Sequence, residues 1–262
     1  MSSVPRLFRL SLAARSVSAR PGRAHPESCQ LRSAPLPARA TPCPSDPAMA
    51  LLVILDGAAV PMAEHYRQWR DELAELGFLR VRTGALSARQ AAQAEVSGMR
   101  CAQELELLQL DAPLPRLPRR APGVSLRAML SSDLPTAAAI DRAAFGEYWW
   151  LDAGMLADVC SATPRHRARV VEVDRQVTGS LISGRSGSIG YVQRLSVHPA
   201  AHRRGLATTL LGDALTWMRR AGVTRVFVNT HTDNDAALAL YRRLGFRSLP
   251  ERLRVYEGFT SR

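Results

Sequence analysis

The stretch that decides the fold spans residues 195–246, where three short sequence patterns follow one another. The first pattern ends an apolar run and reads Leu195-Ser196-Val197-His198-Pro199. The second is a basic, glycine-containing loop that reads His202-Arg203-Arg204-Gly205-Leu206-Ala207. The third reads Asn234-x-x-Ala237-x-x-Leu240-Tyr241-x-x-Leu244-Gly245-Phe246. Apolar residues at a spacing of 3.6 predict a helix over residues 206–220, so the basic loop lies between a strand and a helix.

The basic loop has the composition of an anion site. The first N–H groups of a helix have no partner within the helix and carry roughly half a positive charge, which suits a phosphate group. Gly205 permits close approach of a ligand to the backbone, and Arg203 and Arg204 could add charge-assisted hydrogen bonds. The loop therefore predicts a pyrophosphate site, and a solvated helix cap is the alternative interpretation of the two arginines.

Together the three patterns resemble the acetyl-CoA site of the GCN5-related N-acetyltransferase (GNAT) superfamily. The family's loop reads Gln/Arg-x-x-Gly-x-Gly/Ala, and this chain departs from it at His202. The resemblance implies an α/β fold with a mixed (α+β) sheet, the GNAT acyl-CoA N-acyltransferase fold, over residues 124–262. It also implies acetyl-CoA as co-substrate and no metal.

The resemblance assigns the donor site residue by residue. It implies that the backbone of residues 195–197 holds the pantetheine arm and the acetyl carbonyl. The acetyl-CoA-binding residues it implies are Leu195, Ser196, Val197, His202, Arg203, Arg204, Gly205, Leu206, Ala207, Thr208, Asn234 and Ala237. Two alternatives stay open, because the side chains of Leu195 and Val197 are also typical of a core, and Asn234 is also typical of a helix N-cap.

Tyr241 is the predicted catalytic residue. By resemblance it faces the thioester sulfur and acts as the general acid when the thiolate leaves; a buried structural tyrosine is the alternative. The general base is open, because the predicted strand over residues 188–197 contains no carboxylate. Tyr191 and Gln193 on that strand could hold a water molecule. Other candidate bases are Glu147, Asp152, Glu172, Asp174 and His231.

The predicted activity is acetyl transfer to an amine by direct attack on the thioester, with a protein N-terminus or a small molecule as acceptor. A site without a strong base favours an amine of low pKa. Trp149 and Trp150 lie in the segment 147–152, which the resemblance assigns to the acceptor pocket; ordinary packing is the alternative. The alternative function is a non-catalytic acetyl-CoA-binding sensor, a pseudoenzyme.

The region before residue 124 divides into three parts. Residues 1–48 are rich in Arg and Pro and are expected to be a disordered extension, either a transit peptide or, as we favour, a segment before a true start at Met49. Residues 49–112 alternate predicted strands and helices. Residues 113–123 are rich in Pro and are expected to be a linker.

An internal repeat relates residues 49–112 to the C-terminal region. Residues 76–81 resemble residues 221–226, and residues 92–99 resemble residues 239–246, with Ala94 at the position of Tyr241. The first part lacks the basic loop. We therefore expect a small, degenerate GNAT-like half-repeat that packs and does not catalyse, with a chance likeness of strand-helix units as the alternative.

Composition limits the remaining possibilities. The net charge is +12, and every one of the 35 basic side chains is Arg. No nucleic-acid recognition motif accompanies that charge, so no specific nucleic-acid partner is expected. The 4 Cys show no CxxC pair, and no apolar run could span a membrane. We expect a cytoplasmic monomer or homodimer.

Overall fold

The computed structural model describes residues 28–57, 59–117 and 123–260, and its chain divides into two compact units. Unit 1 contains the described residues up to Glu106, together with His231–Asp233 and those from Pro250 onward. Unit 2 contains Leu107–Thr230 and Asn234–Leu249. The strands β5 and β11 therefore contribute residues to both units.

Unit 2 has the mixed α/β architecture that the sequence predicts. Its helices are α3 (Leu134–Trp149), α4 (Ala153–Ser161), α5 (Leu206–Arg220) and α6 (Asp235–Arg243). Its strands are β6 (Val124–Ala128), β7 (Arg165–Val173), β8 (Gln176–Ser186), β9 (Ile189–Val197) and β10 (Arg225–His231), with parts of β5 (Arg100–Asp111) and β11 (Arg247–Phe259). The strand order in this unit is β11-β5-β10-β9-β8-β7-β6.

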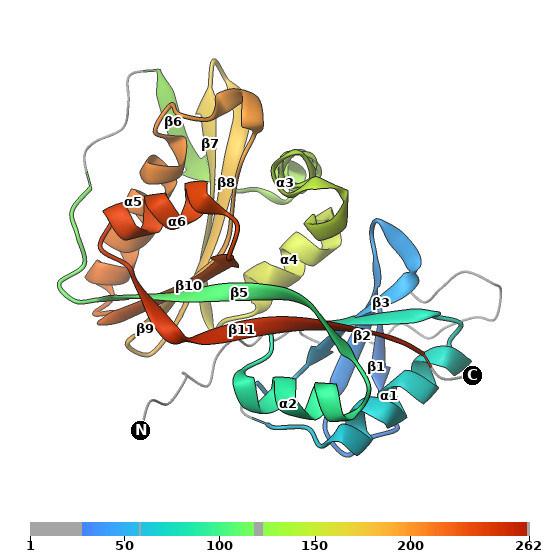
Figure 1. The fold of residues 1–262 in the computed structure, drawn as a ribbon. Coiled ribbons are helices and arrows are strands. Elements are labelled where there is room, and N and C mark those ends of the chain that lie inside the picture. The colour runs from blue at the N-terminus through green and yellow to red at the C-terminus, as the bar shows by residue number, and fades with distance from the viewer. Residues whose placement is uncertain (1–27, 58, 118–122, 261–262) are drawn as a thin grey trace. The chain divides into compact units, whose positions relative to one another are not determined.

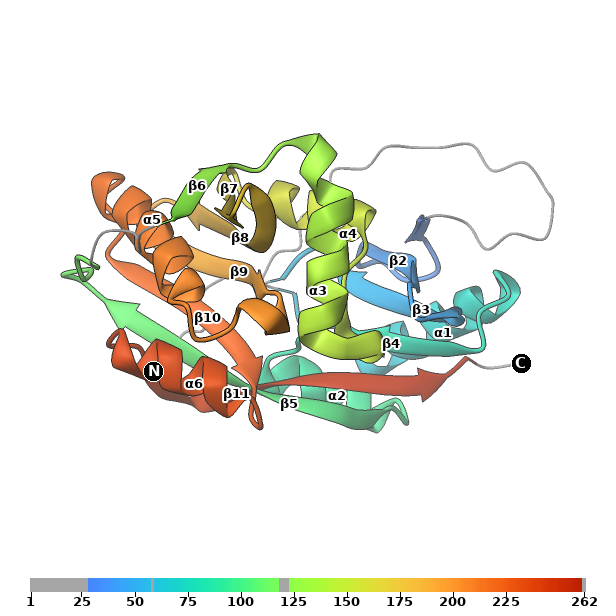
Figure 2. The same cartoon turned by 90° about the horizontal axis from the view of Figure 1, so that it is seen from above.

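Helices cover both faces of this sheet, with α5 and α6 on one face and α3 and α4 on the other (Figures 1 and 2). The 3.6-residue pattern predicted for α5 is confirmed, because its apolar stripe is fully buried. That stripe packs with α6 and with the facing side chains of β8 and β9 in one apolar core. The helix that follows the basic loop is therefore anchored to the sheet by this core.

Unit 1 is a smaller mixed sheet with two helices, α1 (Ala63–Glu75) and α2 (Ala88–Val96). Its further strands are β1 (Cys29–Leu31), β2 (Ala38–Cys43), β3 (Asp46–Ile54) and β4 (Arg80–Thr83), and its strand order is β1-β2-β3-β4-β11-β5. The strands β3 and β4 are parallel, whereas β11 joins β4 antiparallel, from Glu257 opposite Arg82 to Phe259 opposite Arg80.

The local geometry at the helix ends is consistent with the predicted half-repeat. Gly77 and Gly222 both have positive φ, 90° and 73°. The N–H of Gly77 bonds to Ala74 and that of Phe78 to Leu73; in the second copy Gly222 bonds to Arg219 and Val223 to Met218. Both helices therefore end with the same hydrogen-bond pattern, which requires a left-handed residue that glycine supplies without strain.

The second pair of helices ends in the same way. Gly98 and Gly245 have φ of 92° and 91°. The residue after each glycine donates to the carbonyl five residues back, Met99 to Ala94 and Phe246 to Tyr241. The position of Tyr241 in unit 2 is thus occupied by Ala94 in unit 1, as predicted.

The structure corrects the prediction that residues 1–48 are disordered. Residues 29–31, 38–43 and 46–54 form the strands β1, β2 and β3. Ala38 and Ala40 are completely buried in the core of unit 1. Residues 1–27 lie outside the described residues, so for them the prediction is not tested.

Two further expectations need revision. The segment 113–117 has no helix or strand, as expected of a linker, but Leu114 is buried in the core of unit 2. The sequence after Phe246, where two strands are expected, forms one continuous strand, β11. No helix in the described part of the chain is long and apolar enough to cross a membrane.

Candidate functional site

The N-terminus of α5 has no side-chain cap within the described part of the chain. Its N-cap residue is Gly205, which has no side chain to bond to the N–H groups of the first turn, and the first helical bond runs from Thr209 N–H to the Gly205 carbonyl, 2.9 Å. By contrast, α4 and α6 are capped by Asp152 and Asn234, whose side chains accept from Met155 N–H and Ala237 N–H. The N–H groups that begin α5 are therefore available to an external anion.

The loop before α5 turns through two left-handed residues. Arg203 has φ of 60° and Gly205 has φ of 74°. A Cβ added at Gly205 would meet no protein atom within 4 Å, so the backbone conformation, rather than packing within the chain, favours glycine there. Arg203 and Arg204 are exposed and make no ion pair with any described residue. Such a concave loop of N–H groups with free guanidinium groups suits a phosphate.

His202, the departure from the family pattern, bonds back to the preceding strand. Its Nε2 lies 3.0 Å from the carbonyl oxygen of Val197, the last residue of β9. The side chain therefore ties the loop to the strand end, a role that the spacing alone did not reveal.

The strands β9 and β10 pair only at their beginnings. Their parallel ladder joins Ile189 with Arg225 and ends at Tyr191 with Phe227, although β9 continues to Val197 and β10 to His231. The backbone of β9 after Tyr191 therefore makes no ladder of hydrogen bonds with β10. An extended ligand could pair with backbone at this point.

Beyond the end of that ladder, β9 carries a bulge. On β8, Ile182 pairs with Arg194 and the next residue, Ser183, pairs with Val192, which leaves Gln193 as the extra residue. A bulge bends a strand and changes the direction of its side chains, and such bulges are common next to active sites.

The side chains of the predicted pantetheine strand are mostly structural. Val197 belongs to the core of unit 2, and Leu195 packs against it. The hydroxyl of Ser196 lies 3.0 Å from that of Ser180 on the neighbouring strand. The core alternative therefore describes these side chains, and only their backbone groups remain for a ligand.

The two predicted residues at the start of α6 are held by a cap. The Asn234 side-chain oxygen accepts from Ala237 N–H at 3.1 Å, so the N-cap alternative is confirmed. Ala237 is half-buried and packs against the core.

Tyr241, farther along α6, is buried with 4% of its surface exposed, and its ring lies against Phe246. Its hydroxyl makes no hydrogen bond with a described residue. Burial raises the pKa of Tyr241, and the charge of Arg194 acts in the opposite direction. The phenol is therefore protonated at neutral pH, with its O–H free for an external acceptor.

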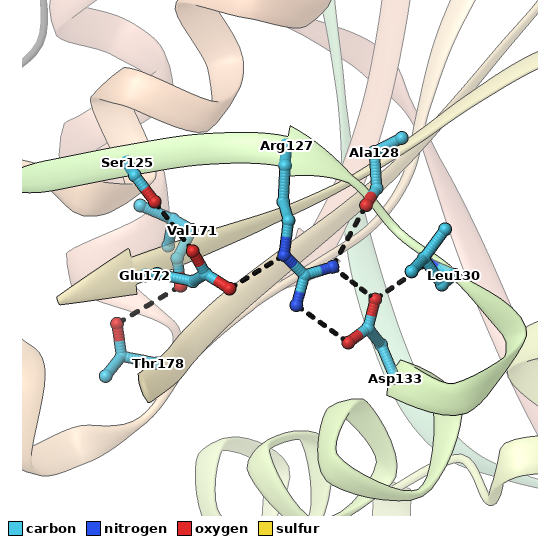
Figure 3. Close-up of polar contacts among 8 residues, drawn as sticks. All are labelled: Ser125, Arg127, Ala128, Leu130, Asp133, Val171, Glu172 and Thr178. Atoms are coloured by element: carbon cyan, nitrogen blue, oxygen red, sulfur yellow. Dashed lines mark hydrogen bonds and ion pairs between the residues drawn. The ribbon is translucent and has the colours of Figure 1, made fainter. Parts of the chain in front are cut away.

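Glu172 is a poor candidate for the general base. Figure 3 shows its carboxylate between Ser125 and Arg127, with hydrogen bonds of 2.7 Å from each. The hydrogen bond from Ser125, and then that from Arg127, lowers the pKa of this carboxyl. Arg127 is fixed in turn by Asp133. Glu172 also lies on β7, separated from β9 by β8.

The other candidate bases are engaged elsewhere or exposed. Asp152 caps α4, and Glu147 forms an exposed ion pair with Arg142. Asp174 is exposed in the turn between β7 and β8, and the ring of His231, the last residue of β10, lies 4.0 Å from the carboxylate of Asp233.

Of the two candidates on β9 itself, Tyr191 is buried and Gln193 is half-buried. Burial raises the pKa of Tyr191. Gln193 donates to the Val159 carbonyl at 3.2 Å, and its buried Oε1 has no hydrogen-bond partner. This Oε1 is the free acceptor on the strand, so Gln193 rather than a carboxylate could bind a water molecule there.

A buried ion pair beside the bulge escaped the sequence analysis. Arg194 makes two hydrogen bonds to Asp141, whose side chain is 0% exposed, at 2.7 and 2.6 Å. The same guanidinium lies over the ring of Phe145. Nothing in the sequence distinguishes Arg194 and Asp141 from an exposed arginine and an exposed helical aspartate, because their pairing depends on the bulge.

Comparison with known proteins gives this geometry a family. The sequence profile described as acetyltransferase (GNAT) family matches residues 129–246. Residues 129–246 belong to the GNAT acetyltransferase family. The matched region runs from the start of α3 through the basic loop to the turn after α6.

Solved structures show the same fold over most of the chain. A tandem GNAT protein from the clavulanic acid biosynthesis pathway is 15% identical, with a TM-score of 0.64, and the match covers 91% of this chain and 85% of that one. A GCN5-related N-acetyltransferase from Kribbella flavida is 15% identical, with a TM-score of 0.60 and coverage of 88% and 89%. One from Sphaerobacter thermophilus is 14% identical, with a TM-score of 0.57 and coverage of 86% and 77%. At these identities the likeness concerns the fold, and the tandem protein agrees with the half-repeat.

The GNAT fold generally binds acetyl-CoA, and the residues present fit that ligand. The uncapped α5 start and the left-handed loop suit the pyrophosphate, and the unpaired part of β9 suits an extended arm. Among residues 28–57, 59–117 and 123–260 no cluster of three His, Cys, Asp or Glu side chains has the arrangement of a metal site.

Proposed function

We propose that this chain is an acetyl-CoA-dependent N-acetyltransferase that transfers the acetyl group directly to an amine. The observation that carries the proposal is the uncapped N-terminus of α5, which follows the bulged strand β9 directly. The proposed ligand-binding residues are those named from the sequence. Arg203, Arg204 and the N–H groups from Gly205 to Thr208 would hold phosphate, and the backbone of residues 195–197 would hold the arm.

The proposed reaction is a single displacement through a tetrahedral intermediate. The amine nitrogen attacks the carbonyl carbon of the thioester, and a backbone N–H of β9 stabilises the negative oxygen. The C–S bond then breaks, and the thiolate takes the proton of the Tyr241 hydroxyl. The attacking nitrogen loses its extra proton to water, and water returns one proton to the phenolate oxygen of Tyr241, so that the products are the amide, the CoA thiol and the restored phenol.

The free hydroxyl of Tyr241 supports its role as the acid. Its raised pKa opposes proton donation, because a thiol of ordinary pKa near 8.5 is a stronger acid than a buried phenol. The charge of Arg194 offsets part of this cost. We therefore expect Tyr241 to contribute at the lower end of the range for a general acid, about 10²-fold, with its proton in place at neutral pH.

The scarcity of bases supports an acceptor that is neutral without help. At pH 7 a lysine amine of pKa about 10.4 is neutral roughly 0.04% of the time, whereas an α-amine of pKa about 7.8 is neutral roughly 14% of the time. Glu172 is held by Ser125 and Arg127, and Asp141 by Arg194. We therefore propose a protein N-terminus or a small amine of low pKa as the acceptor.

A transfer assay tests the proposed activity. The full chain is incubated with acetyl-CoA and a lysine-free hexapeptide, whose unblocked N-terminus is the acceptor of low pKa, and separately with tyramine and spermidine as acceptors of high pKa for comparison. Release of free CoA thiol that depends on the amine, with an acetylated product seen by mass spectrometry, is the expected result. Tight acetyl-CoA binding with no product from a broad amine panel would instead support the non-catalytic sensor.

Two other sequence predictions accompany the proposal. We propose that the protein acts in the cytoplasm and is a monomer or homodimer, without a specific nucleic-acid partner. Size-exclusion chromatography with light scattering would give the mass directly, and a larger assembly would contradict this expectation.

A further inference from the structure

The bulge in β9 turns two successive side chains toward the same face of the sheet. Val192 belongs to the core on the α5 face. Gln193 and Arg194 both make their contacts with the helices of the other face, Gln193 with Val159 of α4 and Arg194 with Asp141 of α3. In a regular strand these neighbours would point to opposite faces, so the bulge is what brings Arg194 to α3.

The side chain of Arg194 makes three hydrogen bonds and one aromatic contact on this face of the sheet. Its guanidinium bonds to both oxygens of Asp141 and, through Nη2, to the Trp149 carbonyl at 2.9 Å. Its Cζ lies 3.5 Å from the centre of the Phe145 ring. A planar guanidinium makes these contacts at once, which the ammonium group of lysine cannot do.

The pair fixes the segment that joins α3 to α4. This segment, residues 146–152, begins at Gly146, where the helix breaks with φ of 71° and ψ of 177°. That conformation is restricted essentially to glycine. The segment is then held at two points, because the Trp149 carbonyl accepts from Arg194 and Leu151 N–H donates to Asp141 at 2.8 Å.

The held segment lies on the face of β9 that the donor's phosphates would not use. The uncapped start of α5 belongs to the opposite face, together with α6. If the phosphates bind at the start of α5, the acceptor approaches the thioester from the other face of the sheet. The segment 146–152, with Trp149 and Trp150, lies on that face.

We propose that Arg194, paired with Asp141, is a positioning residue that holds the segment 146–152 against the bulge of β9 and thereby sets the binding of the acceptor amine. The proposal rests on the acetyl-transfer function given above. Arg194 need not touch the substrate, and it acts through the segment it holds. A displaced segment should therefore weaken acceptor binding and leave the donor site intact.

The test compares Arg194→Lys with a matched control, Arg167→Lys. Arg167 also bonds with two hydrogen bonds to an aspartate on a helix, Asp213 of α5, at 2.6 and 3.0 Å, but it makes no contact with the segment 146–152. Both variants keep the positive charge and lose the two parallel hydrogen bonds from the guanidinium group to the aspartate carboxylate. Three quantities are measured on the full chain: amide exchange of residues 146–152, the Kd for acetyl-CoA, and kcat and KM for the acceptor.

We expect Arg194→Lys to speed exchange in residues 146–152 by about 10-fold, to raise the acceptor KM by roughly 10-fold or more, and to change the Kd for acetyl-CoA less than 2-fold. Arg167→Lys should change none of these by more than 2-fold. Unchanged exchange in the segment, or faster exchange with an unchanged acceptor KM, overturns the proposal. If the wild-type chain transfers no acetyl group, the proposed function fails by itself, whereas the exchange experiment still decides whether Arg194 holds the segment.

Discussion

Removal of residues 28–48 is predicted to unfold unit 1. These residues supply β1, β2 and the start of β3, and their buried side chains are Leu31, Ala34, Ala38, Ala40 and Cys43. A buried leucine contributes about 2 kcal/mol and each small buried side chain about 0.8 kcal/mol, so together they contribute about 5 kcal/mol. The loss also leaves β3 without its antiparallel partner β2.

A loss of about 5 kcal/mol equals the whole stability of many domains, which is about 5–15 kcal/mol. We compare residues 28–262 with residues 49–262 by circular dichroism during heating. The shorter chain should melt at least about 15 °C lower or show no cooperative transition for unit 1. Amide exchange in α1 should be protected only in the longer chain. Melting of the two chains within 3 °C of each other would refute the reasoning, because it would show that unit 1 folds without residues 28–48.

Three further predictions concern unit 2. Tyr241→Phe keeps the ring in the core and removes the free hydroxyl, so kcat should fall roughly 10²-fold with the acetyl-CoA Kd unchanged; unchanged kcat in the thiol-release assay would exclude Tyr241 as the acid. Asn234→Ala removes the cap of α6 and should lower the free energy of unfolding by about 1 kcal/mol in urea titrations, and no change would show that the cap is dispensable. Burial acts to raise the pKa of Asp213, but Arg167 and Arg169 outweigh it and hold the pKa below 3.8. Stability from this group is present above pH 3.8 and lost as the pH falls below it, so Asp213→Asn should flatten the fall in urea midpoint between pH 5 and pH 3; an equally steep fall would contradict this assignment.

The elements of unit 2 were predictable because their local signals agree with the fold. The apolar stripe of α5 and the glycine after it predicted the helix over residues 206–220, which is where it lies. Gly77, Gly98, Gly222 and Gly245 each end a helix in a left-handed conformation, which is why the repeat was visible at low similarity.

The strands before Met49 were missed because their buried residues are small. In β2 the buried positions are Ala38, Ala40 and Cys43, which give little hydrophobic signal, and the alternation of Ala38 and Ala40 is broken before Cys43. Pro42 adds a signal against a strand, and the register does shift between Pro42 and Cys43. Proline is tolerated there because the ladder is irregular at that point.

The partners of β5 and β11 could not be predicted, because each repeat offers an equivalent last strand. In unit 2, β5 lies between β10 and β11, and in unit 1 β11 lies between β4 and β5. The choice depends on contacts across the whole sheet and not on the local sequence. Arg194 was missed for a related reason, since its role depends on the bulge at Gln193, which leaves no sequence pattern.

The most direct test of the account is calorimetric titration of acetyl-CoA into the full chain and two glycine variants. Gly205→Glu places a negative charge at the uncapped start of α5, and Gly187→Glu is the matched control, because Gly187 also has positive φ with open space around its Cβ. We predict micromolar binding by the wild-type chain and by Gly187→Glu, and at least about 10-fold weaker binding by Gly205→Glu. Equal affinity of all three chains, or no binding by any, would contradict a donor site at the start of α5.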